Sequence, residues 1–497
     1  MTNYVSMMLL SDGYKQSHAP QYPKGTEFVE SNWTPRSNKH AKTKDGVVCF
    51  SIEAFFQDLR DSFKKNFFSR NLEVVLVEFS YRYKAYFGVD YCDTSRIADL
   101  WSLQYLPIEV KALPEGSMCP IGVPMMTIRN THEDFYWLPN FLETILSSNL
   151  WGPMTSATIA RGYKQILLNW SEKTCDNNDH VMFQAHDFSM RGMLGDAAAA
   201  ACGAGHLLSF YGTDTIPALG WLDRFHPTSA ESIIGCSVPA TEHSVMSMGT
   251  KDDEIGTFKR LITEIYPKGI VSIVSDTWDL WKVLTEYLPA LKDEVMARDG
   301  KVVIRPDSGD PVDIICGMNQ YDIDKGINYS HKHPSYKGVI ELLWETFGGT
   351  VNSKGYKVLD SHIGAIYGDS ITLERAEDIC ARLEAKGFAS SNIVFGVGSY
   401  TYQYNTRDTY GFAMKATHGV VNGEGRDIFK DPITDDGTKK SLKGRVRVEM
   451  EDGKYVVYDQ QTDAQAKEGA LETVFVDGVM KRTTSLTKMR ERVEKSL

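Results

Sequence analysis

The sequence predicts an α/β fold, in which an irregular α/β barrel is joined to a second, mixed α/β domain. Two observations favour this fold class. Five short apolar runs in the middle of the chain each end in polar or glycine residues, and helical segments separate several of them. Buried parallel strands have this appearance, and strand–helix alternation is typical of a parallel sheet, open or closed. The two ends of the chain look different, with short strands, many prolines and hairpin-like alternation.

The five runs are expected to be buried parallel strands, at 181–185, 269–274, 301–304, 362–367 and 392–395. A helix is expected from about Asp276 to Leu291, and another from Ser370, as its N-cap, to Lys386, with Gly387 ending it. Residues 317–357 are expected to form a surface insertion with a helix near Gly338 to Phe347.

The expected domains follow from these elements. Residues 151–404 would form the barrel, and residues 1–150 and 405–497 would form one mixed domain built from both chain ends. In the C-terminal part, Asp452-Gly453 separates two alternating stretches and is a strong signal for a β-hairpin.

Composition excludes several classes of function. The 497 residues include 54 Lys and Arg against 65 Asp and Glu, and the net charge of −11 argues against a general nucleic-acid binder. The eight cysteines form no CxxC and no zinc-ligand spacing, as is typical of reduced thiols in a cytosolic protein. The start of the chain lacks the features of a signal peptide, and the apolar stretch at 197–208 is too short for a membrane span. A cytoplasmic protein with no nucleic-acid or membrane partner is therefore expected.

Polar residues directly after the expected strands are candidates for chemistry, because function gathers at the carboxyl ends of parallel strands. The loop from Arg305 to Pro311 holds an Arg that can bind phosphate and Asp307, which could accept ribose hydroxyls or help hold a metal–diphosphate. A capped surface turn is the alternative, since these are also common turn residues. The loop is not a Walker motif.

Two further clusters stand out. Gly396-Val-Gly-Ser399 and Gly368-Asp369 offer small residues whose backbone N–H groups can approach a phosphate, although a lone GxG is weak evidence. In Ser237-Val-Pro-Ala-Thr-Glu-His-Ser244, His243 could act as acid, base or nucleophile, or could be a structural, hydrogen-bonded histidine.

Taken in order, the motifs of this chain resemble the nicotinamide phosphoribosyltransferases, a family of type II phosphoribosyltransferases. The resemblance is collinear from about residue 8 to residue 485. It rests on Asp12-Gly-Tyr-Lys, Pro107-Ile-Glu-Val-Lys-Ala-Leu-Pro-Glu-Gly, His186-Asp-Phe-Ser-Met-Arg-Gly, Gly212-Thr-Asp-Thr, Ser237-Val-Pro-Ala-Thr-Glu-His-Ser, Val271-Ser-Ile-Val-Ser-Asp, Ile304-Arg-Pro-Asp-Ser-Gly-Asp-Pro, Gly368-Asp and Phe429-Lys-Asp-Pro.

The resemblance implies a pentosyltransferase of pyridine nucleotide (NAD) biosynthesis. Nicotinamide and phosphoribosyl diphosphate would give nicotinamide mononucleotide and diphosphate, with substrate-bound Mg²⁺ and no metal site of the protein's own. ATP hydrolysis would be coupled through a phosphohistidine. The family is homodimeric, with two active sites shared between the subunits.

The resemblance also implies roles for single residues around the nicotinamide. Phe188 and Tyr14, the latter from the partner subunit, would sandwich the pyridine ring. Asp214 would accept a hydrogen bond from the carboxamide and repel the carboxylate of nicotinate. Arg191 would contact the amide oxygen or the diphosphate.

The remaining roles concern phosphate groups. His243 would take the phosphoryl group from ATP, oriented by Asp276 and by Glu242. Asp307 would hold the ribose hydroxyls, and Arg305 the anionic groups nearby. The ribose 5-phosphate would be bound by Gly368, Asp369, Gly398 and Ser399. Further phosphate contacts, mostly across the dimer interface, would come from Arg36, Arg407, Lys415 and Lys439.

Two alternatives stay open at this level. A nicotinate phosphoribosyltransferase would differ in the preferred base, and a non-catalytic binding or signalling protein on the same fold would lack activity. The absence of a signal peptide and the full set of candidate catalytic residues count against the second alternative.

Overall fold

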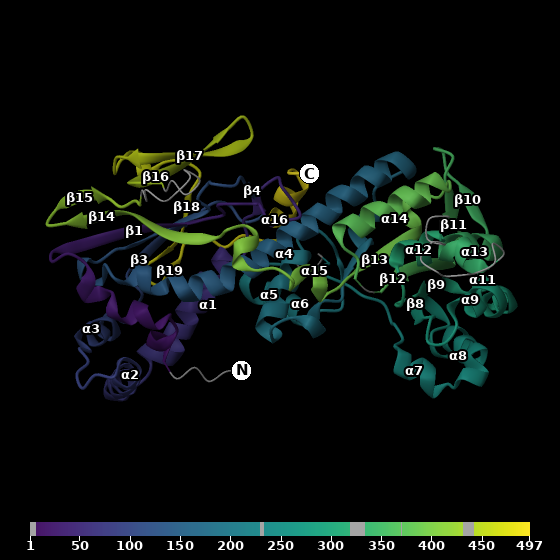
Figure 1. Cartoon of the computed structure of the whole chain (residues 1–497), viewed down its shortest axis with the longest axis horizontal. Coiled ribbons are helices and arrows are strands. Elements are labelled where there is room, and N and C mark those ends of the chain that lie inside the picture. Colours follow the sequence, from purple (N-terminus) through teal and green to yellow (C-terminus); the bar gives the residue numbers. More distant parts are fainter. Residues whose placement is uncertain (1–5, 229–232, 319–332, 369, 431–441) are drawn as a thin grey trace. The chain divides into compact units, whose positions relative to one another are not determined.

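A computed structural model describes residues 6–228, 233–318, 333–368, 370–430 and 442–497 (Figure 1). Asp369 and Lys439, two of the expected phosphate ligands, lie outside these residues. The chain forms two compact units. The sheet domain comprises Met1–Thr158, Gly220–Ser232 and Asn405–Ser496, and the barrel domain comprises Ile159–Leu219 and Ile233–Tyr404. Gly220–Ser232 thus belongs to the sheet domain, although the sequence places it inside the barrel interval.

The sheet domain is built on an antiparallel sheet with the strand order β15-β14-β1-β5-β3-β18-β19. Three strands come from the first third of the chain and four from its last fifth. Their bounds are β1 (Thr26–Thr34), β3 (Ile108–Ala112), β5 (Met126–Asn130), β14 (Ala413–Val421), β15 (Glu424–Asp427), β18 (Glu472–Val476) and β19 (Val479–Met480). The central strands therefore join residues far apart in the sequence: Asn32 of β1 pairs with Lys415 of β14, 383 positions later.

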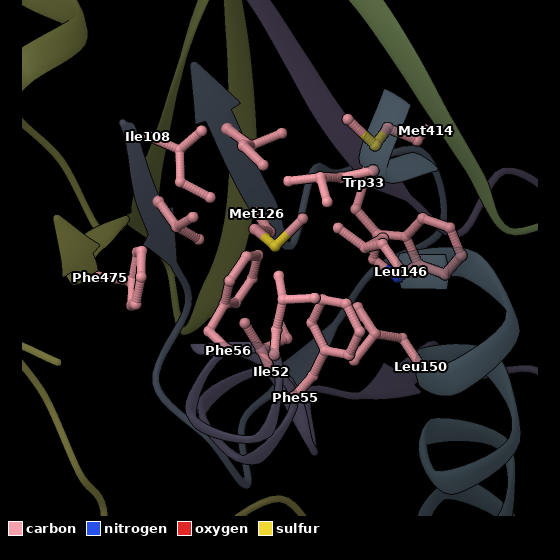
Figure 2. Packing of buried hydrophobic residues seen from close by; sticks show 14 of the residues in the cluster. Trp33, Ile52, Phe55, Phe56, Ile108, Met126, Leu146, Leu150, Met414 and Phe475 are labelled. Atoms are coloured by element: carbon pink, nitrogen blue, oxygen red, sulfur yellow. The ribbon is translucent and has the colours of Figure 1, made fainter. Parts of the chain in front are cut away.

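Helices cover the apolar side of this sheet. They are α1 (Ile52–Phe63), α2 (Leu72–Phe87), α3 (Ser95–Leu103) and the first part of α4 (Leu138–Thr174), while α16 (Leu486–Glu494) lies elsewhere in the same domain. Figure 2 shows Trp33 and Met126 of the sheet against Leu146 and Leu150 of α4. Trp33 is fully buried and stacks on Phe412, with 5.3 Å between ring centroids and 8° between planes.

Two short pairings complete the sheet domain, β2 (Val47–Val48) with β4 (Met118–Cys119) and β16 (Arg445–Glu451) with β17 (Lys454–Gln461). The second pair confirms the hairpin expected at Asp452-Gly453. Glu451 pairs with Lys454. Asp452 and Gly453 have φ angles of 47° and 77°, as a type I′ turn requires.

The barrel domain contains a parallel sheet with the order β7-β6-β13-β12-β9-β8. Its strands are β6 (Ala185–Asp187), β7 (Gly212–Thr213), β8 (Lys268–Val274), β9 (Asp299–Arg305), β12 (Ile363–Tyr367) and β13 (Ile393–Val397). The predicted parallel α/β architecture is confirmed. One expected strand is shorter than predicted, because Val181–Phe183 forms a 3₁₀ turn before β6.

The segment 236–241 closes the sheet into a barrel. Cys236 forms a parallel bridge with Gly212 of β7, and Ala240 forms one with Ser272 of β8. The Cys236 N–H donates to the Tyr211 carbonyl at 2.7 Å, and the Ser272 N–H donates to the Pro239 carbonyl at 2.9 Å. These bonds give both edge strands a partner, so the segment links the two edges of the parallel sheet.

Helices pack outside the parallel strands (Figure 1). They are the rest of α4, α5 (Asp196–His206), α6 (Ile216–Phe225), α7 (His243–Met248), α8 (Glu254–Arg260), α9 (Leu280–Lys282), α10 (Leu288–Ala290), α11 (Lys292–Met296), α12 (Pro311–Cys316), α13 (Gly338–Phe347), α14 (Leu373–Ala385) and α15 (Ser399–Tyr402).

Two helix starts differ from expectation. The helix expected from Asp276 begins at Leu280, where Asp279 accepts a hydrogen bond from the Lys282 N–H. The N-cap of α14 is Thr372, whose hydroxyl accepts from the Arg375 N–H, and not Ser370. The end of α14 before Gly387, which has a φ of 76°, is as predicted.

The interval 317–357 is not simply a surface insertion. Helix α13 has the predicted bounds, but Val339, Ile340 and Leu343 are buried in the apolar core of the barrel domain. The expectation was wrong because the helix supplies part of the barrel's own covering layer. A short antiparallel pair, β10 (Gly349–Val351) and β11 (Lys357–Leu359), follows it. Throughout the described ranges, no helix combines the length and apolar character needed to cross a membrane.

Candidate active site

The barrel domain gathers the expected site residues at one edge, where its parallel strands end. Phe188 and Arg191 follow β6, Asp214 follows β7, and Asp276 follows β8. Arg305 ends β9 and Asp307 follows it, Gly368 follows β12, and Gly398 and Ser399 follow β13. Glu242 and His243 follow the closing segment 236–241. The carboxyl ends of neighbouring parallel strands lie side by side, which explains how motifs far apart in the sequence meet.

A carboxylate, an imidazole and a hydroxyl form one cluster at this edge. The Asp214 Oδ1 atom accepts hydrogen bonds from His186 Nε2 at 2.9 Å and from Ser237 Oγ at 2.5 Å. The His186 ring lies 4.5 Å from the ring of Phe188, tilted by 30°. Asp214 is thus held beside an aromatic face, with Oδ2 left to meet a ligand.

The charge of Asp214 is stabilised by these neighbours. Burial alone would raise its pKa, but the hydrogen bonds from His186 and Ser237 and the charge of Arg305 keep the pKa below its ordinary value. At neutral pH the side chain is therefore an anionic hydrogen-bond acceptor.

A second cluster surrounds His243, the first residue of α7. Its Nδ1 atom lies 3.1 Å from the Thr277 hydroxyl. Its Nε2 atom lies 3.9 Å from Asp276 Oδ1 and 3.7 Å from Asp307 Oδ2. The Asp307 N–H donates to Asp276 Oδ2 at 2.9 Å, which fixes the two carboxylates relative to each other. Oδ1 of Asp276 is buried without a hydrogen-bond partner in the described chain.

Glu242, which was expected to help orient His243, does not contact it in this cluster. Its carboxylate accepts a hydrogen bond from Ser244, and its side chain is exposed. Thr277 occupies the position beside His243 instead. The sequence signal for Thr277 was its place one residue after Asp276 at the end of a strand.

Arg305 links the two clusters. Its guanidinium donates to the Thr241 carbonyl. Burial lowers its pKa, while the carboxylates of Asp307, Asp214 and Asp276 act in the opposite direction. Gly368 is packed against the side chains of Arg305 and Asp307. A Cβ at Gly368 would lie 3.0 Å from Asp307 Oδ1 and 3.3 Å from Arg305 Cδ. A larger residue at Gly368 would crowd the cation–carboxylate pair.

The turn after β6 lies against the start of α15. A Cβ at Gly192 would clash with Ser399 Oγ, at 2.0 Å, and the Phe188 N–H donates to the Val397 carbonyl at 2.9 Å. Arg191 and Ser399 are therefore brought to neighbouring positions. Gly398 precedes α15 as its N-cap residue.

A cavity of about 460 Å³ opens among these residues and continues along the bore. Phe188, Asp214 and Arg305 line it at the carboxyl ends of the strands, and His180 and Ser391 line it near the amino ends. Its size is that of an ordinary small-molecule site. His186 and Ser237 also line the cavity, although the sequence analysis gave them no role. The signal that could have found them is their place in the same motifs as Phe188 and His243, which were given roles.

The other expected residues belong to the sheet domain. Tyr14 lies in a 3₁₀ turn and is 58% exposed. Arg36 follows β1 and donates to the Gly411 carbonyl at 3.2 Å, and Arg407 pairs with its neighbour Asp408. The pKa of Lys415 is lowered by burial and by the positive charges of Arg36, Lys430 and Lys15, although Glu143 acts in the opposite direction. Arg36 and Lys415 thus share a cationic region with two lysines that had no assigned role.

The fold is that of the type II phosphoribosyltransferase α/β barrels. Over 98–100% of its length the chain is similar to solved structures of nicotinate-nucleotide pyrophosphorylase from Pyrococcus furiosus (TM-score 0.59, 15% identity, 98% of that chain covered) and human nicotinic acid phosphoribosyltransferase (0.53, 14%, 93%). At these identities the likeness concerns the fold alone.

Sequence comparison defines the family. Residues 183–478 match the model of the nicotinate phosphoribosyltransferase (NAPRTase) family, so the chain belongs to that family. Among its relatives, the nicotinamide phosphoribosyltransferase of Acinetobacter baylyi is 48% identical, with 98% of this chain and 96% of the relative covered. The nicotinamide phosphoribosyltransferase of Mycoplasma pneumoniae is 36% identical, with 90% and 96% covered.

Proposed function

We propose that this protein is a nicotinamide phosphoribosyltransferase of NAD salvage. It would join nicotinamide to phosphoribosyl diphosphate, giving nicotinamide mononucleotide and diphosphate. One observation carries the choice of base: the ionised Asp214, held by His186 and Ser237 beside Phe188 at the mouth of the cavity. The names of the relatives with 48% and 36% identity support the same choice.

Asp214 provides the specificity for the amide. Both of its hydrogen bonds end on Oδ1, so Oδ2 can accept a hydrogen bond from the carboxamide NH₂ group. Nicotinate would bring a carboxylate to the same place, and two anions in a partly buried site repel each other. Phe188 would stack on one face of the pyridine ring.

The second cluster suits phosphoribosyl diphosphate. Arg305 would bind its anionic groups and Asp307 its ribose hydroxyls. Asp276 and Asp307 offer two carboxylates, and the buried Oδ1 of Asp276 has no partner of its own in the described chain. That donor set fits Mg²⁺ carried on a diphosphate, since Mg²⁺ commonly takes one or two carboxylates and completes its shell with phosphate and water. Bound there, the ion would neutralise charge on the leaving group.

The transfer of the phosphoribosyl group requires positioning of the substrates and stabilisation of charge. It does not require a nucleophile of the protein to attack the sugar. The pyridine nitrogen forms the new bond to ribose C1 as the bond from C1 to the diphosphate oxygen breaks. Phe188 and Asp214 would orient the ring toward C1, and the carboxylate of Asp307 would stabilise the positive charge that develops on the sugar.

His243 would couple ATP hydrolysis to this reaction. Its Nε2 atom faces the carboxylates of Asp276 and Asp307, which favours the tautomer with the proton on Nε2. Nδ1 then accepts the hydrogen bond from the Thr277 hydroxyl; ATP would displace this hydroxyl, and the freed lone pair on Nδ1 would attack the terminal phosphoryl group. The phosphorus–nitrogen bond forms as the bond to ADP breaks, and water later releases phosphate.

The complete site would require a homodimer. A second copy would supply Tyr14 to the other face of the pyridine ring, and Arg36, Arg407, Lys415 and Lys439 to the phosphates. The exposure of Tyr14 and the cationic region around Lys415 support this arrangement.

The base preference is tested by measuring kcat/KM with nicotinamide and nicotinate side by side. We expect the wild-type protein to prefer nicotinamide and Asp214→Asn to lose most of that preference, through a lower activity with nicotinamide. Asp252→Asn, an exposed aspartate of the same domain, is the matched control. Preference of the wild-type protein for nicotinate would contradict the proposed substrate.

ATP coupling is tested with His243→Ala. We expect nicotinamide mononucleotide formation to persist without stimulation by ATP, and no phosphoprotein to form from ATP labelled on its terminal phosphate. Undiminished stimulation by ATP in this variant would contradict the phosphohistidine.

A further inference from the structure

A cysteine–histidine cluster lies apart from the carboxyl edge of the barrel. Cys175 directly follows α4, and its Sγ atom lies 3.9 Å from His180 Nε2, 3.5 Å from Ser390 Oγ and 3.6 Å from Thr174 Oγ1. The Thr174 hydroxyl donates its hydrogen bond to the Trp170 carbonyl, at 2.7 Å. His180 and Ser390 are therefore the donors best placed to bond the sulfur.

This environment separates Cys175 from the other cysteines. Burial alone would raise its pKa, but hydrogen bonds, chiefly from His180 and Ser390, lower the pKa to about 6. Burial raises the pKa of Cys316 to about 12 and raises the pKa of Cys380, whose thiol lies within electrostatic reach of Cys175. The carboxyl end of α4 carries a partial negative charge that opposes a thiolate, so the stabilisation comes from the side-chain donors.

The cluster stands at a wall of the bore. His180 and Ser391 line the cavity of about 460 Å³, near the amino ends of the strands. Cys175 itself is 5% exposed, and the turn that follows it, with Asp176 and Asn177, is exposed. The sulfur therefore lies just beneath an exposed turn and beside a histidine that lines the cavity.

We propose that Cys175 and His180 form a redox-reactive pair in which small hydroperoxides oxidise the Cys175 thiol to a sulfenic acid. This role is independent of the proposed transferase activity. His180 takes the thiol proton, and the thiolate then attacks one oxygen of the hydroperoxide. An S–O bond forms, the O–O bond breaks, and the imidazolium returns its proton to the departing oxygen. The cysteine is oxidised by two electrons, and the hydroperoxide is reduced to water or an alcohol.

The test is oxidation of the full-length, pre-reduced protein by hydrogen peroxide, with dimedone to trap sulfenic acid and peptide mass spectrometry to locate it. Cys92 is the internal comparison, because it is more exposed than Cys175 while burial raises its pKa. At pH 6.5 we expect Cys175 to react about 10-fold faster than Cys92, since its larger thiolate fraction outweighs its lower intrinsic nucleophilicity. The rate at Cys175 should rise with pH to a midpoint near the thiol pKa of about 6.

Two variants test whether His180 is the cause of the reactivity of Cys175. His180→Gln keeps a hydrogen-bond donor but cannot hold the proton, so it should slow oxidation at least about 10-fold and move the midpoint upward. Cys175→Ser should abolish the labelled peptide, and circular dichroism with thermal melting checks that both variants fold. Equal or faster labelling of Cys92, or an unchanged rate and midpoint in a folded His180→Gln protein, would overturn the proposal.

Discussion

Charged residues are used in opposite ways in the two domains. In the sheet domain, buried Arg445 donates to Glu30 at 2.9 Å, and half-buried Arg482 donates to buried Glu53 at 2.6 Å. At the edge of the barrel, His243 lies 3.7–3.9 Å from two carboxylates and is 44% exposed. Such close pairs use their hydrogen-bonding capacity within the protein, and removing one partner would leave a poorly compensated charge. Looser, exposed groups keep bonding capacity for a ligand.

The strand directions explain where these two kinds of residue occur. Antiparallel strands end alternately at the two edges of a sheet, so side chains that follow them are divided between opposite edges. Parallel strands all end at the same edge, and their following loops converge there. Core substitutions in the sheet domain should therefore reduce stability, and edge substitutions in the barrel should reduce activity.

The largest effect on stability is expected from Trp33→Ala in the sheet domain. The side chain is fully buried against Phe412, so its loss should cost about 3–5 kcal/mol of unfolding free energy. Urea unfolding measures this change. Tyr91→Ala is the matched control, because Tyr91 is 75% exposed and its loss should change stability by less than about 0.5 kcal/mol. Similar losses of unfolding free energy in both variants would contradict the assignment of Trp33 to the core of the sheet domain.

Asp307→Asn should separate activity from stability at the barrel edge. The substitution keeps the shape of the side chain and removes the charge that faces His243, so kcat/KM should fall about 10²–10³-fold with little change in melting temperature. Asp310→Asn in the same loop is the control. Asp310 caps α12 by accepting from the Val312 and Asp313 N–H groups, and asparagine caps a helix equally well. A large loss of stability in Asp307→Asn would assign Asp307 a structural role.

The smallest expected effect concerns a buried carboxyl group of the barrel domain. Glu254 is 2% exposed, its Oε1 atom has no hydrogen-bond partner in the described chain, and burial raises its pKa to about 7. The folded state therefore holds this proton more tightly than the unfolded state, where the pKa is about 4.3. The stabilisation is complete below that pH and is lost as the pH rises through about 7.

Glu254→Gln removes the titration. Between pH 5.5 and pH 8 the melting temperature of the wild-type protein should fall about 2–4 °C further than that of the variant. Glu264→Gln, an exposed neighbour, should behave as the wild type. An identical pH dependence in wild type and Glu254→Gln would show that Glu254 stays ionised in the folded protein.

The parallel strands and the edge where they end could be predicted from the sequence. Buried strands are continuous apolar runs, and the polar residues that follow each run mark its carboxyl end without any knowledge of side-chain geometry. The details that depend on side-chain direction escaped prediction. Glu242 adjoins His243 in the sequence, but neighbouring residues at the start of a helix point in different directions. Thr277 reaches His243 from another strand end, and only the packed barrel brings the two together.

Other differences arise from competition between similar signals. Ser370 and Thr372 are both suitable caps for α14, and Ser370, with a φ of 55°, falls outside the helix. The closing segment 236–241 makes only isolated backbone bridges, and Pro239, which has no N–H to donate, makes it unlike a strand in the sequence. Its role appears only when both edges of the sheet are known.

The assembly of the sheet domain from both chain ends sets an order for folding during synthesis. Strands β1, β3 and β5 leave the ribosome early, but β14, which pairs with β1, begins only at Ala413. At about 5–20 residues per second, the roughly 280 residues between them take about 15–60 seconds to translate. During that interval the parallel sheet is completed while one edge of β1 stays unpaired. Chaperones that shield exposed strand edges would thus act mainly on the amino-terminal third of the nascent chain.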